Sequence, residues 1–254
     1  MRPVLIQIGP IGIPSYGLML LISFVIAIFL VKKTARRFGI SPVFVENLAF
    51  WIMVGVIIGG RLLYVLFHMK EYIHNLLGII EIWTGGMMFF GGFIGALIAG
   101  LLYVRKQKVS TLLLADMISP SLGLGEFFTR IGCFLNGCCF GVPSSLPWAV
   151  KFPDNSLPAH ALDQNCAIHP TQLYSSLFGL LLFFFLQKRF NQKHFRGELF
   201  SLYLIFSAVF RFGVDFIRYY ENVQNLLINQ FISIAIAVVG VVMLVMTYKK
   251  KFVD

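Results

Sequence analysis

Seven long apolar runs, separated by more polar segments, dominate the pattern of this sequence. Each run approaches the roughly 20 residues that an α-helix needs to cross the hydrocarbon core of a bilayer. We therefore predict transmembrane helices over residues 16–31, 46–67, 87–104, 112–135, 172–187, 198–217 and 227–248. The longest less apolar stretch, residues 138–171, is predicted to be an external loop.

Composition supports a membrane protein. Of the 254 residues, 58% are hydrophobic and only 13% are charged, and the mean hydropathy is +0.82. Soluble domains have about half apolar and a quarter charged residues, so this chain lacks the charges to coat a core in water. We predict a single all-α integral membrane domain over residues 1–254, a seven-helix bundle. A disordered chain, a coiled coil and a soluble doubly wound fold are excluded.

The 21 lysines and arginines are unevenly distributed if consecutive helices cross the membrane in alternating directions. Basic residues concentrate on the cytoplasmic side of membrane proteins, so this bias predicts the N-terminus outside and the C-terminus in the cytoplasm. The net charge of +10 is then an orientation signal, and we expect no nucleic-acid partner. Fourteen basic residues follow the first, third, fifth and seventh runs: Lys32, Lys33, Arg36, Arg37, Arg105, Lys106, Lys108, Lys188, Arg189, Lys193, Arg196, Lys249, Lys250 and Lys251. Four lie on the opposite side: Arg2, Lys70, Lys151 and Arg218.

Three further arginines, Arg61, Arg130 and Arg211, lie within or at the edge of predicted spans. A charge at that depth costs several kcal/mol unless it meets water, a headgroup or a counter-ion, so each is a functional candidate. Asp215 follows Arg211 by four residues, which places both on one helix face, and Glu126 precedes Arg130 by the same spacing. One interpretation is that these pairs only neutralise each other.

The other interpretation is that the arginines face a shared cavity and bind a phosphate, because the guanidinium fork matches phosphate oxygens and stays charged. In a membrane the available phosphates are lipid headgroups, so we expect a phospholipid ligand or substrate. The second and third runs also carry glycines at spacings that allow close helix packing. The segment WTGGMMFFGGFIG adds two glycine pairs at the start of a run and suggests backbone that bends beside a ligand.

Seven segments in order resemble the prolipoprotein diacylglyceryl transferase family along nearly the whole chain: IGPIGIPSYGLML, ENLAFWIMVGVIIGGRLLYVLF, WTGGMMFFGGFIGA, RIGCFLNGCCFG, HPTQLY, FRFGVDFIR and NQFIS. The resemblance implies transfer of the diacylglyceryl group of phosphatidylglycerol to the thiol of the lipobox cysteine in a prolipoprotein signal peptide. It implies a multi-pass enzyme of the bacterial cytoplasmic (inner) membrane, and we expect a monomer that needs no cofactor. Positive potential from arginines would favour the thiolate and stabilise the departing phosphate.

The resemblance also implies site residues. Arg130 matches the family arginine that contacts the headgroup, and Arg211 matches the sixth-helix arginine with its following acidic residue, Asp215. We expect Arg130, Arg211, Asp215 and Tyr16 to be catalytic. Residues expected to bind substrate are Arg130, Asn136, Gly137, Gly141, Arg61 and His169.

The chain departs from the family pattern at several polar positions. The family's histidine before the second glycine pair is Phe90 here, so Glu126, Asp215 or a thiolate stabilised directly by arginine would have to take the place of a histidine base. The chain is therefore expected to be a divergent transferase, with a paralogue using another substrate or an inactive relative as alternatives. A phospholipid-binding protein or transporter that uses the same arginines without chemistry is the rival class. The other departures are Cys133, Cys138, Ser175 and Ser207.

All four cysteines are expected on the outer side, where disulfides can persist. If a disulfide forms, it joins Cys166 to Cys138 or Cys139, while plain packing is the alternative. The spacing of Cys133, Cys138, Cys139 and Cys166 matches no recognised metal motif, so we predict no metal site.

Overall fold

The computed structural model describes residues 4–8, 11–72, 76–81, 83, 85–153, 156–162, 166–192 and 194–250. Arg2, Lys193 and Lys251, and residues 154–155 and 163–165 of the predicted external loop, lie outside the described residues. The elements are β1 (Val4–Ile8), β2 (Ile11–Pro14), α1 (Ser15–Arg37), α2 (Pro42–Phe67), α3 (Met69–Tyr72), η1 (Leu76–Ile79), α4 (Phe89–Lys106), α5 (Thr111–Asn136), α6 (Leu157–Ala161), α7 (Thr171–Phe190), α8 (Glu198–Asp215) and α9 (Val223–Lys250).

Each of the seven apolar runs predicted as a helix lies on a long helix, namely α1, α2, α4, α5, α7, α8 and α9. Five of these are long and apolar enough to cross a membrane: α1, α2, α4, α7 and Val223–Lys249 of α9. The chain is an integral membrane protein with an essentially all-helical fold. The two other helices, α5 and α8, carry the charged residues Asp116, Glu126, Arg130, Glu198, Arg211 and Asp215.

A short hairpin precedes α1 and was not predicted. Strands β1 and β2 pair antiparallel, with Gln7 opposite Gly12 and Ile8 opposite Ile11. Strands of five and four residues are too short for a clear alternating pattern, which explains the omission.

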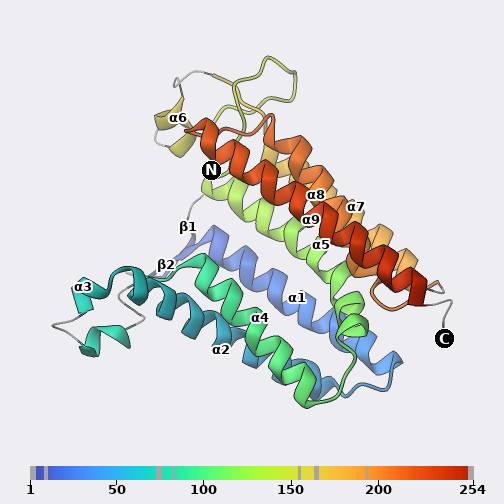
Figure 1. The fold of residues 1–254 in the computed structure, drawn as a ribbon. Coiled ribbons are helices and arrows are strands. Elements are labelled where there is room, and N and C mark those ends of the chain that lie inside the picture. Colours follow the sequence, from blue (N-terminus) through green and yellow to red (C-terminus); the bar gives the residue numbers. More distant parts are fainter. Residues whose placement is uncertain are drawn as a thin grey trace. The chain divides into compact units, whose positions relative to one another are not determined.

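The chain divides into two compact units, one formed by Met1–Leu30 with Ala115–Asp254 and the other by Val31–Leu114. In the first unit, α8 packs against α7 and α9, as Figure 1 shows in orange and red. The rings of Phe178 on α7 and Phe210 on α8 stack with centroids 4.0 Å apart.

Asp116 on α5 fixes the start of α8. Its carboxylate accepts hydrogen bonds from the backbone N–H groups of Gly197 at 2.6 Å and Phe200 at 3.0 Å. Unpaired N–H groups at a helix N-terminus favour a negative charge, so this buried carboxylate acts as a cap supplied from another helix.

Residues following α5 have a small apolar core of their own. Phe140, Phe152 and Ile168 are buried together, and Cys166 and Tyr219 pack against them. Isolated backbone bridges join Pro143 and Val150 to Ile168. The predicted external loop is therefore folded chain over its described residues.

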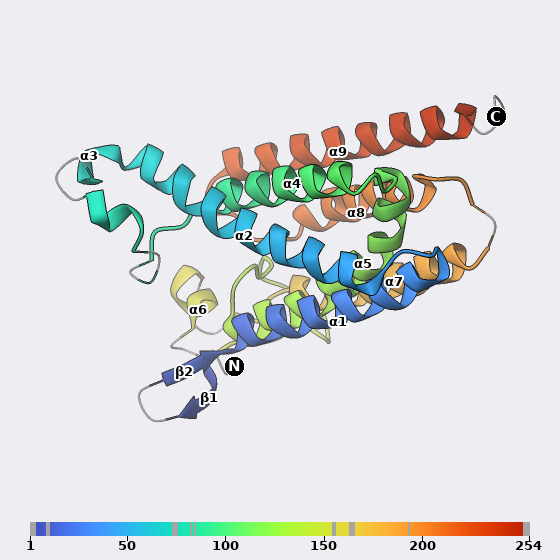
Figure 2. The same ribbon diagram turned by 90° about the horizontal axis from the view of Figure 1, so that it is seen from below.

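In the second unit, α2 and α4 lie side by side, which the turned view of Figure 2 also shows. A methyl group added at Gly55 or Gly95 would overlap the other residue's carbonyl, and Gly59 and Gly91 are related in the same way. Small residues allow helix backbones to approach closely in membranes, so the predicted role of these glycines is confirmed.

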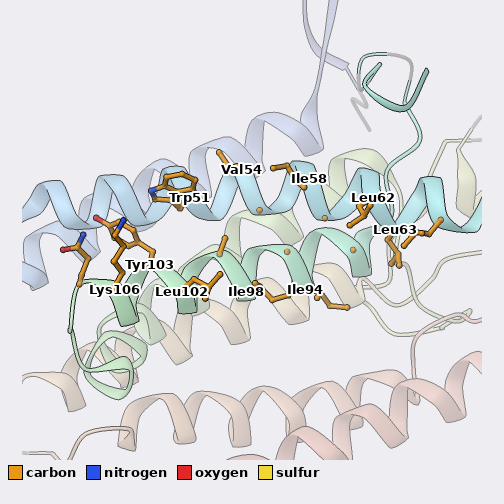
Figure 3. A pocket seen from close by; sticks show the side chains of 17 residues that line it. Trp51, Val54, Ile58, Leu62, Leu63, Ile94, Ile98, Leu102, Tyr103 and Lys106 are labelled. Carbon is orange, nitrogen blue, oxygen red and sulfur yellow. The ribbon is translucent and has the colours of Figure 1, made fainter. Parts of the chain in front are cut away.

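The same two helices line an apolar cavity of about 600 Å³ (Figure 3). Trp51 and Tyr103 lie toward the end near Lys106, and Leu62 and Ile94 lie further along the helices. The cavity is lined almost entirely by hydrocarbon side chains, which suits contact with apolar chains rather than with water.

We expect Gly95→Ala to destabilise the protein by roughly 1–3 kcal/mol, because the new methyl would collide with the α2 backbone. The matched control is Gly100→Ala on the same helix, where the methyl would meet Ile52 Cγ1 at an ordinary 3.5 Å. That control is expected to be neutral or stabilising by up to about 1 kcal/mol, from helix propensity. Thermal unfolding in detergent measures both, and equal midpoints would contradict the packing argument.

Candidate active site

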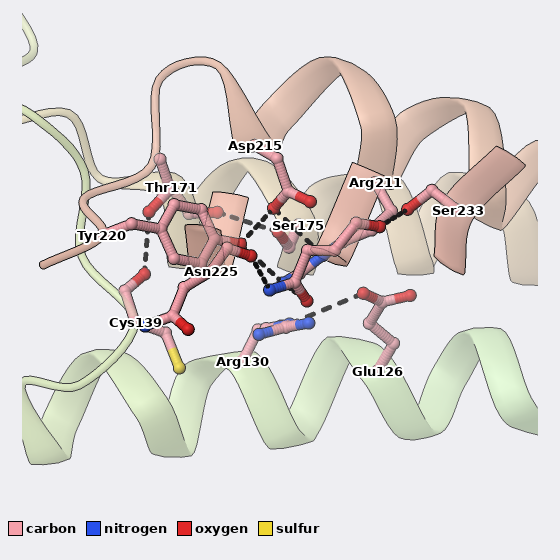
Figure 4. A network of polar contacts seen from close by, with 11 residues as sticks. Glu126, Arg130, Cys139, Thr171, Ser175, Arg211, Asp215, Tyr220, Asn225 and Ser233 are labelled. Atoms are coloured by element: carbon pink, nitrogen blue, oxygen red, sulfur yellow. Dashed lines mark hydrogen bonds and ion pairs between the residues drawn. The ribbon is translucent and has the colours of Figure 1, made fainter. Parts of the chain in front are cut away.

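Arg211, which is half-buried, and Asp215, which is fully buried, form an ion pair at the end of α8. Arg211 Nε lies 3.1 Å from Asp215 Oδ1, as the i, i+4 spacing predicted, and the Asp215 side chain is 0% exposed. Tyr220, just after the helix, donates a hydrogen bond to Asp215 Oδ1 at 2.7 Å and accepts one from Arg211 Nη2 at 3.0 Å. Asn229 of α9 also accepts from Arg211 Nη2 at 3.5 Å (Figure 4). The guanidinium is thus held from three directions.

Burial raises the pKa of Tyr220, and its hydrogen bond to the Asp215 carboxylate acts in the same direction. The phenol therefore stays protonated at neutral pH and remains a donor to the carboxylate. Asp215 Oδ2 is buried without a hydrogen-bond partner among the described residues.

Arg130 lies on α5 beside Glu126, with its Nε 3.5 Å from Glu126 Oε1. Figure 4 shows the Arg130 and Arg211 guanidiniums adjacent to one another, with Glu126 on the same side of α5. The three charges interact electrostatically, as does Arg218 with Arg211. Three arginines from α5, α8 and the segment after α8 therefore share two carboxylates.

Arg218 is a site residue that the sequence analysis missed, since it was counted only as an outer basic residue. Its guanidinium lies 5.4 Å from the centroid of the Tyr220 ring, and its Nε is buried without a hydrogen-bond partner among the described residues. Its position one turn after Asp215 was the available signal. An excess of positive charge with an unused buried donor is suited to binding an anion such as phosphate.

The other expected residues of this unit lie around α5. Tyr16, in the first turn of α1, interacts electrostatically with Arg130 and with Cys133. Asn136 is the last residue of α5, and Gly137 has a φ of +78°, a conformation that favours glycine. The geometry gives Gly137 a role in the turn.

Gly141 packs directly against the backbone of His169. Its N–H donates to the His169 carbonyl at 3.1 Å, and an added methyl would lie 2.6 Å from His169 Cβ. The His169 ring is linked to the Tyr174 hydroxyl at 3.3 Å, which accepts from Trp148 Nε1 at 2.8 Å. These residues join the folded segment after α5 to the start of α7.

Arg61 belongs to the second unit and is bound by backbone carbonyls. Its guanidinium donates to Ile79 at 2.9 Å, Gly78 at 2.5 Å, Gly85 at 2.6 Å and Gly86 at 2.9 Å. Four of its five N–H donors are thereby used in fixing the segment before α4. The structure supports a positioning role, and the expected substrate contact of Arg61 stays a prediction.

Phe90 also lies in the second unit and is 67% exposed. An aromatic hydrocarbon ring offers no atom that accepts a proton, so the proton acceptor must be another group.

All four cysteines are free thiols, and the disulfide considered for Cys166 is not present. Cys166 instead packs against the apolar core around Phe140. The sulfurs of Cys133, Cys138 and Cys139 lie within 4.8 Å of one another. Sequence spacing argued against a metal site, and that inference missed this convergence because the turn after α5 brings the last two thiols back toward the helix.

Comparison with known proteins gives one family over nearly the whole chain. The family model described as prolipoprotein diacylglyceryl transferase matches residues 3–246. A Clostridium tetani protein named phosphatidylglycerol–prolipoprotein diacylglyceryl transferase is 36% identical over 95% of this chain and 96% of its own length. Proteins of the same name from Bordetella avium and Nitratidesulfovibrio vulgaris are 36% and 37% identical, over 98% and 85% of this chain and 95% and 80% of their own lengths.

We expect Asp215→Ala to destabilise the protein by roughly 2 kcal/mol, because it leaves the half-buried Arg211 beside two other arginines without its counter-ion, and Tyr220 without its acceptor. The control is Glu46→Ala, which removes the partner of Lys32 in a pair where the Glu46 side chain is 51% exposed. That change should cost less than about 1 kcal/mol. Unfolding in detergent measures both, and similar losses would show that Asp215 is not a buried counter-ion.

Proposed function

The chain belongs to the prolipoprotein diacylglyceryl transferase family, and on that basis we propose that it transfers the diacylglyceryl group of phosphatidylglycerol to the lipobox cysteine of prolipoproteins. In this reaction the cysteine sulfur attacks a glycerol carbon of the lipid and forms a thioether. The carbon–oxygen bond to phosphate breaks, and glycerol phosphate leaves with the electron pair. The thiol proton passes to a base.

The observation that carries this proposal is the arginine cluster of the first unit. Arg130 pairs with Glu126 and Arg211 with Asp215, Arg218 has no ion pair among the described residues, and the Arg130 side chain is 20% exposed. The guanidiniums offer N–H donors to a phosphodiester, and preorganised donors would stabilise negative charge that develops on the leaving oxygen. We assign Arg130 to the headgroup and Arg211 to the same phosphate through its remaining donor capacity.

Glu126 is the proton acceptor that the geometry favours. The Asp215 side chain is fully buried, whereas the Glu126 side chain is 22% exposed and adjoins Arg130. A base must come within hydrogen-bond reach of the proton it removes, and of these two carboxylates the partly exposed Glu126 meets this condition without rearrangement. Asp215 then positions Arg211.

We further propose that α1, α2, α4, α5, α7, α8 and α9 all cross the bacterial cytoplasmic membrane as one domain, and that the protein is a monomer. The charge bias of fourteen basic residues against four supports an external N-terminus and a cytoplasmic C-terminus. In that orientation Arg130, near the end of α5, lies at the outer side, where signal-peptide cysteines become accessible.

A phospholipid-binding protein without transferase activity, or an inactive or retargeted relative, is the second candidate. Phe90 at the position of the family histidine favours it. Purified protein given phosphatidylglycerol and a lipobox peptide distinguishes the two, because only the transferase yields a thioether-linked lipopeptide. Lipid binding without that product would overturn the enzyme assignment.

We predict that Arg130→Gln lowers kcat/KM for the lipopeptide reaction by about 10²–10³-fold, the usual cost of removing one donor from a developing oxyanion. The control is Arg105→Gln at the exposed end of α4, which should keep wild-type activity. Residual activity of the Arg130 variant above a third of wild type would exclude its role at the phosphate.

We also predict that Glu126→Gln lowers the rate near neutral pH by about 10²-fold or more, because the substrate thiol loses its base. The rate deficit should shrink above about pH 8.5, the pKa of a free thiol, because the substrate thiol then ionises without a base. Rates measured from pH 6 to pH 10 check this. A Glu126→Gln profile parallel to the wild-type profile would assign the proton to another group.

A further inference from the structure

Cys133, Cys138 and Cys139 form a cluster that the transfer reaction does not use. Their three sulfur atoms lie within 4.8 Å of one another. Cys133 is buried, and the other two are partly exposed. Three thiols this close can share weak hydrogen bonds with one another, and they also present three sulfur ligands at one point.

The backbone holds the cluster in place from two sides. At the end of α5, the N–H groups of Gly137 and Cys138 donate to the Cys133 carbonyl at 2.9 and 3.1 Å. Gly137 and Cys139 both have positive φ, at 78° and 61°, so the chain reverses within three residues. Positive φ is uncommon for a residue other than glycine, and here it returns the Cys139 side chain toward α5.

The start of α7 provides the second support. Thr171 Oγ1 donates to the Cys139 carbonyl at 2.9 Å, and Gln172 Nε2 donates to the Cys138 carbonyl at 2.8 Å. Both of these side chains are buried, with their residues 2% and 1% exposed. The two cysteine backbones are thus fixed, and the Cys138 thiol lies 3.8 Å from the Cys133 carbonyl oxygen, to which it donates a weak hydrogen bond.

This geometry matches a thiolate-bound cation. Zinc–sulfur bonds of about 2.3 Å in a tetrahedral site place the sulfurs about 3.8 Å apart, so rotation of the side chains closes the cluster around one ion. Thiolate sulfur favours soft or borderline ions such as Zn²⁺ and Cu(I) over Mg²⁺ or Ca²⁺.

The charge balance is also favourable. One Zn²⁺ with three thiolates carries a net charge of −1. Arg130 and Arg218 both interact electrostatically with Cys139, and Figure 4 shows the Cys139 sulfur beside Arg130. A buried charge needs such compensation, and two guanidiniums supply it.

We propose that Cys133, Cys138 and Cys139 bind one Zn²⁺ ion, which ties the turn after α5 to the helix itself. Each thiol loses its proton to solvent when it coordinates. Three protein ligands leave a fourth coordination position for water or for an added thiol. The site does not depend on the proposed transfer reaction, since the metal binds in the absence of both substrates.

The test begins with the full-length protein, purified in detergent under a reductant and dialysed against trace Zn²⁺. Elemental analysis should give one zinc per chain, and replacement by Co²⁺ should give intense sulfur-to-cobalt charge-transfer absorption from three thiolates. Cys139→Ser should weaken zinc affinity at least 10-fold and reduce the charge-transfer intensity. Cys166→Ser is the matched control and should leave both unchanged, because Cys166 lies in the separate apolar core.

Several results would overturn the proposal. These are less than a tenth of an equivalent of zinc after titration, unchanged affinity in Cys139→Ser, or equal loss in Cys166→Ser. Copper bound as Cu(I) with no zinc would overturn the choice of ion. A disulfide within the cluster, detected by thiol alkylation and mass spectrometry of protein isolated without reductant, would make it a redox site instead. The cobalt spectrum of the wild-type chain counts the thiolates even if a variant fails to fold.

Discussion

The ion pair between Arg211 and the buried Asp215 is the interaction on which the site depends. A guanidinium that is partly removed from water needs a counter-charge, and here a fully buried carboxylate supplies it from one turn along the same helix. Tyr220 donates to that carboxylate and accepts from the guanidinium, which joins the end of α8 to the segment that follows. Arg211 is thereby fixed beside Arg130. The Asp215 carboxylate offsets the repulsion between the neighbouring guanidiniums, which could not otherwise gather at one point.

Arginine has two different uses in this chain, and hydrogen bonding separates them. Arg61 donates four hydrogen bonds to backbone carbonyls, so its charge stabilises the segment before α4. The acceptors are Ile79, Gly78, Gly85 and Gly86. Arg130 makes one ion pair with a partly exposed carboxylate, and its remaining donors face a site lined by other arginines. A ligand of Arg130 would compete with one ion-pair partner, whereas a ligand of Arg61 would compete with four backbone acceptors.

Local patterns in the sequence predicted the helices and the ion pairs. Apolar runs specify helices in a bilayer, and i, i+4 spacing is sufficient to place Asp215 beside Arg211. The Arg61 contacts were not predictable, because carbonyl acceptors carry no residue-specific signal. The cysteine cluster was missed for another reason: its convergence depends on positive φ at Cys139 and on anchoring by Thr171 and Gln172 from a distant part of the chain. The β1–β2 hairpin was also missed, because its strands of five and four residues are too short to show a clear alternation of apolar and polar residues.

The charge movement in the proposed reaction explains why the carboxylates differ in burial. A phosphodiester and a thiolate each carry one negative charge, and transfer moves the thiolate's charge onto the phosphate oxygen. The arginines therefore interact more strongly with the transition state than with bound lipid, which is the condition for catalysis. If Glu126 accepts the thiol proton, it becomes neutral and no longer competes for Arg130 as the phosphate gains charge. Asp215 has no such freedom, because its burial keeps it paired with Arg211 throughout the reaction. The proposed reaction therefore uses one fixed counter-ion, Asp215, and one that can be neutralised, Glu126.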